Sequence, residues 1–181
     1  DAIGYIKKTV IGDVMNIKKV RVDKEGTGMG WGAVYAQYLE SMDQIGEQGN
    51  GLSVSRQLYK GDEALNESAP LKVGDKITVR LTVKADRDMD FVQIKDDRAA
   101  CMEPLQAVSG FRWSNGLGYY QATKDASTQF FIDQMRKGTY VIEYQVYVNR
   151  TGEYQAGIAT VQSAYAPEFG GHTGGYRVMV E

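Results

Sequence analysis

The sequence has little cysteine, proline and histidine. It contains one cysteine (Cys101), three prolines and one histidine (His172) in 181 residues. A single cysteine excludes an intrachain disulfide and a cysteine-based metal cluster, and we interpret Cys101 as a small buried apolar residue. A single histidine leaves no set of side chains for Ser-His-Asp or Cys-His catalysis. We therefore predict no enzymatic activity, no catalytic residues, no metal site and no cofactor.

The sequence also lacks long apolar runs and a surplus of charge of one sign. No run approaches the ~20 apolar residues that a membrane-spanning helix needs, so direct membrane contact is not expected. The net charge is −2, without a basic cluster interleaved with aromatics, which argues against nucleic acid as a partner. The chain has no signal peptide and begins at Asp1 without Met. We expect either a mature product or a piece of a longer protein, and favour the second.

Tyrosine and glycine, by contrast, are abundant. The 12 tyrosines suit a pleated, half-buried surface, and the 21 glycines suit turns and bulges between strands. Apolar residues alternate with polar ones most clearly in residues 77–83 and again in residues 139–149. A period of two indicates strands with one buried face. The sequence therefore predicts an all-β fold, an antiparallel β-sandwich of the immunoglobulin-like kind, preceded by a partial β-domain.

Further strands are predicted along the whole chain. In the C-terminal part they are residues 52–59, 91–94, 118–123, 127–133 and 176–180. In the N-terminal part they are residues 2–10, 16–22 and 31–38, the last preferred as a strand over a helix because glycines precede it. Residues 41–51 are polar and are interpreted as a linker, and residues 101–118 lack periodicity and are predicted as a long connection.

The last 44 residues, 138–181, combine a strand, a turn and a glycine-rich segment. The strand 139–149 is expected to turn at residues 149–152 and to return antiparallel over residues 152–163, which would make a long hairpin. Residues 164–175 contain too much glycine for a predicted strand and are expected to form a loop. This loop carries aromatic residues at a place where a sandwich can present them to a partner.

Two other motifs, one acidic and one aromatic, are considered as binding sites. Residues 86–90 (Asp-Arg-Asp-Met-Asp) have the rhythm of a calcium loop, but Phe91 stands where glycine is needed, so a solvated acidic turn is predicted. The aromatic-rich residues 111–120 are either a connection folded over the end of the sandwich or a binding surface. The second possibility gives an alternative function, an immunoglobulin-like module of the cell envelope that binds glycan or protein.

An ordered set of short motifs extends over essentially the whole chain. In order, the motifs are residues 31–38 (Trp-Gly-Ala-Val-Tyr-Ala-Gln-Tyr), 73–75 (Val-Gly-Asp), 96–100 (Asp-Asp-Arg-Ala-Ala), 138–141 (Gly-Thr-Tyr-Val) and 165–168 (Tyr-Ala-Pro-Glu). Together they resemble the C-terminal part of bacterial alpha-2-macroglobulin-like proteins. The resemblance implies that residues 1–48 are the returning half of a CUB-like β-domain. It also implies that residues 51–181 are the last macroglobulin-type sandwich.

The same resemblance implies a function and a location. Members of this family trap proteases in the periplasm or cell envelope, where cleavage of a bait region triggers a conformational change. Members with a Cys-x-x-Gln thioester also capture the protease covalently. Met-Glu-Pro follows Cys101, so the thioester motif is not in this chain. The expected partners are therefore other domains of a parent chain, namely thioester and macroglobulin-type domains, and target proteases through that parent.

In some bacterial members a loop of the last domain covers the thioester, and residues 165–168 look similar to that loop. The resemblance implies an interdomain docking loop of Tyr165, Pro167, Glu168 and Phe169. A purely structural explanation stays open, in which Tyr165 and Pro167 fix a long loop to the sandwich. Residues 1–50 would leave sheet edges unpaired in this chain, and we expect them to mediate self-association or to be partly disordered.

Overall fold

The computed structural model describes residues 6–12, 17–35, 37, 39, 41, 45–66 and 69–181. The chain forms two compact units, Asp1–Leu39 and Glu40–Glu181. The second unit holds every strand of the described residues. Those residues include no helix, and hence no helical segment that could cross a membrane.

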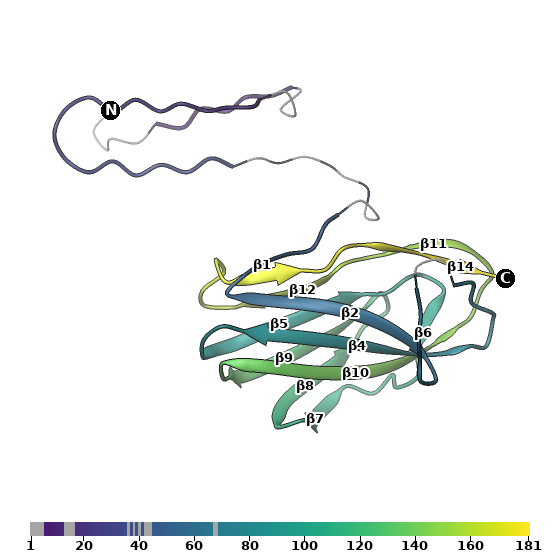
Figure 1. Ribbon diagram of the computed structural model, residues 1–181. Coiled ribbons are helices and arrows are strands. Elements are labelled where there is room, and N and C mark those ends of the chain that lie inside the picture. Colours follow the sequence, from purple (N-terminus) through teal and green to yellow (C-terminus); the bar gives the residue numbers. More distant parts are fainter. Residues whose placement is uncertain are drawn as a thin grey trace. The chain divides into compact units, whose positions relative to one another are not determined.

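The strands of the second unit form a 12-stranded antiparallel sheet and a separate two-stranded sheet (Figure 1). The strands are β1 (Gln48–Asn50), β2 (Leu52–Lys60), β3 (Glu63–Ala64), β4 (Lys76–Ala85), β5 (Met89–Asp97), β6 (Met102–Pro104), β7 (Gly110–Ser114), β8 (Leu117–Thr123), β9 (Ser127–Met135), β10 (Gly138–Val148), β11 (Gly152–Ala156), β12 (Ala159–Ser163), β13 (Gly170–His172) and β14 (Tyr176–Val180). The order in the large sheet is β6-β10-β4-β2-β1-β13-β12-β5-β9-β8-β7, with β3 paired to β2, and β11 and β14 make the small sheet.

The large sheet curls into two layers around one hydrophobic core. Buried residues of β2, β4 and β10 share that core with buried residues of β5, β9 and β12. One layer is β6-β10-β4-β2 and the other is β12-β5-β9-β8-β7, and the short strands β1 and β13 join them. The predicted all-β antiparallel sandwich is confirmed.

The clearest predicted strands are confirmed together with their buried faces. On β4 the residues Ile77, Val79, Leu81 and Val83 are buried, and the polar residues between them are more exposed. On β10 the same alternation buries every second residue from Ile142 to Val148. The predicted strands 118–123 and 127–133 are also present, as β8 and β9, and they pair as a hairpin with Thr123 opposite Thr128. In each case one face of a strand covers the core, which produces the period of two.

The predicted return of the chain alongside β10 is wrong. One side of β10 pairs with β4 over ten residues, and its C-terminal end also pairs with β6, so the returning chain cannot pair along it. After Val148 the chain leaves this layer: β11 pairs with β14, and β12 pairs with β5 and β13. Gly152 begins β11 with a φ of 131°, a conformation that side chains disfavour.

Three segments predicted as linker, connection or loop contain four short strands. They are Gln48–Asn50 (β1), Met102–Pro104 (β6), Gly110–Ser114 (β7) and Gly170–His172 (β13). For β13 the reason is close backbone approach, because a Cβ added at Gly171 would lie 2.7 Å from the carbonyl oxygens of Gln48 and Leu52. Glycine here lets three chain segments approach closely, and composition alone suggested a loop.

The predicted strands of the first unit are wrong wherever the structure describes them. Residues 6–10, 17–22, 31–35 and 37 form neither strand nor helix, and the remainder of those predicted strands lies outside the described residues. A strand needs a hydrogen-bonded neighbour, and none is present for these segments in the described part of the unit. The large apolar side chains of these segments are exposed, among them Ile6 and Trp31.

Candidate docking loop

The candidate loop, residues 164–169, connects β12 to β13 at one end of the sandwich. Its backbone is closed by two hydrogen bonds. The amide of Phe169 donates to the carbonyl of Ala166 (2.9 Å), and the amide of Ser163 donates to the carbonyl of Phe169 (3.1 Å). The loop is therefore a compact turn at the end of an antiparallel pair of strands.

Tyr165 is the most exposed aromatic residue of this loop, with 78% of its surface accessible. Its ring meets the ring of Phe91 edge-on, with centroids 5.0 Å apart and planes at 82°. The amide of the preceding Ala164 donates to the carbonyl of Phe91 at 2.9 Å. Tyr165 and Phe91 therefore form one exposed aromatic pair that is fixed through both side chain and backbone.

Phe91 takes part in this pair at a strained backbone position. Its φ is 51°, although β5 stays in register with β9 on both sides of it. A bulky side chain is a genuine outlier in this left-handed region, and such strain concentrates at functional sites. Nearly half of the Phe91 surface, 48%, faces solvent. The sequence predicted Phe91 as the first residue of a strand and excluded it from a calcium loop, but did not suggest its pairing with Tyr165.

Pro167 and Glu168 are exposed, while their carbonyl groups are held in place. The side-chain amide of Gln162 donates to the carbonyl of Pro167 (3.1 Å), and that of Asn50 donates to the carbonyl of Glu168 (2.7 Å). Both residues line a shallow cleft of about 640 Å³ over β1, β12 and β13. The backbone of this part of the loop is thus fixed and its side chains are directed outward.

Phe169 differs from the other three residues because it anchors the loop. It is half-buried and packs against the hydrophobic core. The Arg87 guanidinium lies 4.7 Å from the centre of its ring. The ring also lies so close to Gly51 that a Cβ there would be 2.7 Å from it, and Gly51 has a φ of 70°. The structure therefore presents Tyr165, Pro167 and Glu168 outward and holds the loop by Phe169.

A buried polar cluster connects the two layers of the sandwich, and sequence analysis did not identify it. The Arg56 guanidinium pairs with the Asp96 carboxylate between the two layers, and their side chains are 4% and 1% exposed. The Tyr144 hydroxyl donates to the other Asp96 oxygen at 2.7 Å. Arg56 also donates to the carbonyl of Gly157 (2.6 Å), just before β12. The cluster thus connects β2 and β10 to β5 and to the start of the β12–β13 pair.

The electrostatics of this cluster follow from its burial. Burial raises the pKa of Asp96, and the Arg56 guanidinium and the Tyr144 hydroxyl oppose that rise. Burial also raises the pKa of Tyr144 and of Tyr176, whose ring lies 4.5 Å from the Arg56 guanidinium. A buried pair of this kind holds its charges only because hydrogen bonds satisfy both partners. Arg56 lies within the predicted strand 52–59, but its partner Asp96 is 40 residues away and no local pattern could show it.

Comparison with known proteins matches the sandwich and its loop. A family model described as Bacterial Alpha-2-macroglobulin MG10 domain matches residues 51–168. Among solved structures, Escherichia coli alpha-2-macroglobulin activated by porcine elastase has a TM-score of 0.65 at 16% identity, over 76% of this chain and 14% of that chain. Salmonella alpha-2-macroglobulin reacted with methylamine has a TM-score of 0.64 at 19% identity, over 75% of this chain and 10% of that chain. At these identities the structures establish a shared fold.

The chain is short relative to every protein named in these comparisons. One curated protein, Circularly permutated Ras protein 2 of Dictyostelium discoideum, is 28% identical over 166 residues, which are 88% of this chain and 4% of that protein. A native E. coli alpha-2-macroglobulin structure that reaches the C-terminus is covered to 24%, with a TM-score of 0.63 and 17% identity. The chain therefore corresponds to one part of much longer proteins.

Proposed function

Because the chain belongs to the bacterial alpha-2-macroglobulin MG10 domain family, we propose that it is a non-enzymatic structural module of a larger protease inhibitor in the bacterial periplasm or cell envelope. Residues 51–181 are the terminal macroglobulin-type sandwich of that parent. Residues 1–48 are one half of a CUB-like β-domain, and the other half belongs to another part of the parent. The family match over residues 51–168 and the length of the solved relatives support this assignment.

The partners of the module are neighbouring domains of the parent, including its thioester domain. Target proteases act on the module through the parent. Relatives solved after activation by porcine elastase and by trypsin support proteases as the activating signal. The module itself works by packing: a rigid sandwich carries a loop that holds a neighbouring domain before activation and releases it afterwards.

The exposure of Tyr165 on a fixed backbone is the observation that carries this proposal. Exposed aromatic residues on a rigid support are typical anchors of protein interfaces. The Tyr165–Phe91 pair offers such an anchor, and Pro167 and Glu168 extend it along the loop. In a parent with a thioester, this aromatic pair covers the bond and keeps water and amines away until the bait region is cleaved.

The test uses the full-length parent with Tyr165→Ala. If the parent has a thioester, its loss in methylamine should be roughly tenfold faster than in wild type, equivalent to about 1.4 kcal/mol of lost protection. Compaction after protease cleavage should also change, because the loop no longer holds its partner. Both are measurable, by thiol release and by small-angle scattering.

Tyr147→Ala is the matched control, because Tyr147 is an exposed tyrosine on β10, away from the loop. It should leave both measurements unchanged. An unchanged thioester lifetime together with unchanged compaction in Tyr165→Ala would rule out the docking role. In a parent without a thioester, compaction alone decides.

A further inference from the structure

The outward face of the layer β12-β5-β9-β8-β7 carries a row of aromatic side chains that the core does not use. Strand register aligns Phe111, Tyr120 and Phe131 on β7, β8 and β9, and extends the row to Gln93 and Gln162 on β5 and β12. Phe111 is 81% exposed and meets Tyr120 edge-on at 5.1 Å. Side chains directly opposite each other on neighbouring strands are in contact range, so the row is continuous.

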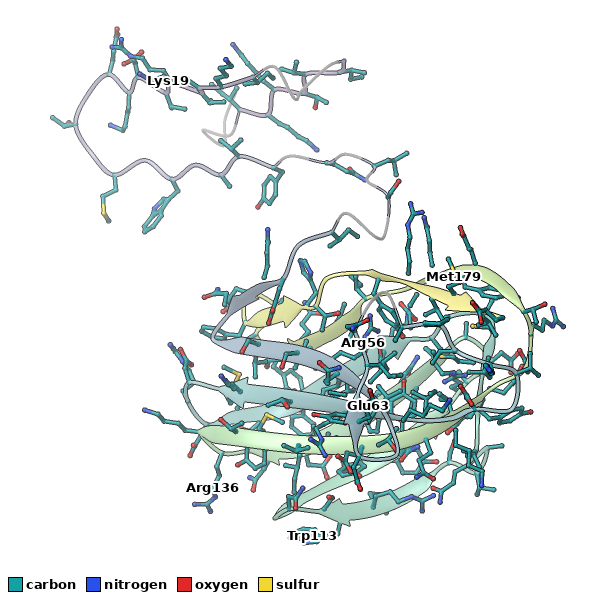
Figure 2. All side chains as sticks on the ribbon, turned by 45° about the vertical axis from the view of Figure 1, so that its right-hand side comes forward. Lys19, Arg56, Glu63, Trp113, Arg136 and Met179 are labelled. Atoms are coloured by element: carbon teal, nitrogen blue, oxygen red, sulfur yellow. The ribbon has the colours of Figure 1, made fainter. Side chains whose placement is uncertain are left out.

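Trp113 widens this row at its outer end, on β7 (Figure 2). It lies opposite Gly118 of β8, where an added Cβ would be 2.9 Å from two carbon atoms of the indole ring. The ring therefore lies against the bare glycine backbone. Its surface is nevertheless 76% exposed, so the opposite side of the indole faces solvent. A flat ring supported on one side and open on the other is a stacking platform.

The polar groups around the aromatic row are neutral, acidic or paired in a salt bridge. Among the described residues that register places on this face, the one cation is Lys95, which is paired with Asp97 at 2.9 Å. Asp133 is exposed beside the row, and the Gln93 amide lies within it. A platform that stacks nucleic-acid bases needs a positively charged groove, which this face lacks. Amide and carboxylate groups beside flat rings suit a neutral ligand that is rich in hydroxyls.

We infer that this face binds a neutral, extended glycan. The sugar rings place their C–H faces on Trp113, Phe111, Tyr120 and Phe131, and their hydroxyls bond to Asp133 and Gln93. Neighbouring strands are about 4.8 Å apart, close to the length of one pyranose residue in an extended β-linked chain. An oligosaccharide that crosses β7, β8 and β9 therefore meets a new side chain of the row at each sugar. The row borders the loop at residues 164–169, because the Gln162 side chain at its end donates to the Pro167 carbonyl.

The test is a fluorescence titration of the whole 181-residue chain. The sequence has two tryptophans, so Trp31→Phe leaves Trp113 as the sole tryptophan reporter. Chitohexaose and cellohexaose are the probes, and the α-linked glucan dextran is the comparison ligand. A saturable change in Trp113 fluorescence with a β-linked probe, and none with dextran, is expected.

Matched variants locate the binding site by calorimetry. Phe111→Ala and Trp113→Ala, checked for folding by circular dichroism, should each weaken binding roughly tenfold. Tyr147→Ala removes an exposed aromatic side chain from β10, in the other layer of the sandwich, and should leave affinity unchanged. If Trp113→Ala does not fold, Phe111→Ala alone decides. Absence of saturable binding to both probes, or binding that survives the row variants, overturns the proposal.

Another outcome would show that the partner of this face is a protein domain and not a glycan. If the probes do not bind, and Trp113 is protected from acrylamide quenching in the full-length parent, the face is an interface between domains and the glycan proposal is wrong.

Discussion

At the scale of single residues, Arg56 and Asp96 place opposite charges in the interior of the sandwich. A buried pair contributes little net stability compared with an apolar pair, but removal of one partner leaves a buried charge uncompensated. Asp96 also accepts from Tyr144, and Arg56 also donates to Gly157. These contacts make the pair a connection between layers, and a single substitution there is more damaging than a double one.

Arg56→Met should lower the free energy of unfolding by about 3–5 kcal/mol, because Asp96 is left without its cation. Urea denaturation of the variant and of wild type measures the loss. Arg56→Met combined with Asp96→Asn is the control, since the amide of the new residue can still accept from Tyr144 and carries no charge. Recovery of at least half of the loss is expected, and a double variant as unstable as Arg56→Met would contradict the explanation.

Alkaline pH should destabilise the fold through Tyr144 and Tyr176, whose pKa values are raised by burial. Above pH ~10 the unfolded chain releases these protons, whereas the native state retains them. The native state then binds more protons, so the free energy of unfolding falls as pH rises. The two protonated tyrosines therefore contribute fully to the free energy of unfolding below pH ~10, and this contribution is lost as the pH rises above it.

Urea midpoints measured from about pH 8 to about pH 11 test this expectation. Tyr176→Phe has no proton to release and should show a shallower decline than wild type. Equal slopes for the two proteins would show that Tyr176 does not contribute.

At the scale of strands, β13 depends on glycine because it lies between two other backbones. A Cβ at Gly171 would clash with the carbonyl oxygens of Gln48 and Leu52. A Cβ at Gly170 would lie 2.9 Å from the carbonyl oxygen of Val161. Backbone atoms in a paired sheet cannot move aside as a flexible side chain can. Positions 170 and 171 of the seam between the two layers therefore leave no space for a side chain.

Gly171→Ala should destabilise the domain by about 1–3 kcal/mol and loosen the loop that follows β12. Hydrogen exchange at the amides of Ser163 and Phe169, which form or border the loop, reports on that loosening. Gly46→Ala is the matched control, because an added Cβ there meets nothing within 4 Å. Equal stability of the two variants would refute the role of close packing at Gly171.

Sequence patterns predicted the strands whose two faces have different surroundings. β4 and β10 alternate cleanly because one face covers the core, so their period of two is visible. β1 and β13 gave no such signal, because each has only three residues. In β13, moreover, two of the three are glycines that allow close approach of neighbouring backbones, so no apolar pattern is present. The hairpin after β10 was mispredicted because local turn residues do not show which edges are already paired.

The candidate loop shows the same limit at its individual residues. The sequence suggested Tyr165, Pro167, Glu168 and Phe169 as one set. Phe169 differs because it packs beside Gly51 and under Arg87, and these contacts come from distant parts of the chain. Asp96 and Arg56 are similarly separated by 40 residues, so no local pattern could show that they pair.

At the scale of the whole molecule, the two units differ in the solvent exposure of their apolar side chains. The second unit buries its apolar residues in one core. The described part of the first unit exposes them instead, among others Ile6, Ile11, Val22 and Trp31. Extended chain with exposed apolar residues and unpaired backbone groups tends to pair with another chain.

The 181-residue chain should therefore self-associate through residues 1–50, while a fragment of residues 40–181 should stay monomeric. Light scattering over a range of concentrations distinguishes the two. A monodisperse monomer for the whole chain, with amides protected from hydrogen exchange throughout residues 1–50, would contradict the expectation.

The position of β1 has a mechanical consequence. β1 is the first strand of the second unit, and the chain enters it at Gln48. It pairs with β13 over only three positions. Its last residue, Asn50, also holds the carbonyl of Glu168 in the loop. A pulling force applied through the preceding chain would load β1 first and would detach it before the long β4–β10 pair yields. The loop would then lose its hydrogen bond from Asn50, and the cleft would lose the wall that β1 forms. Tension in the chain before β1 would therefore release the loop while the core stays folded.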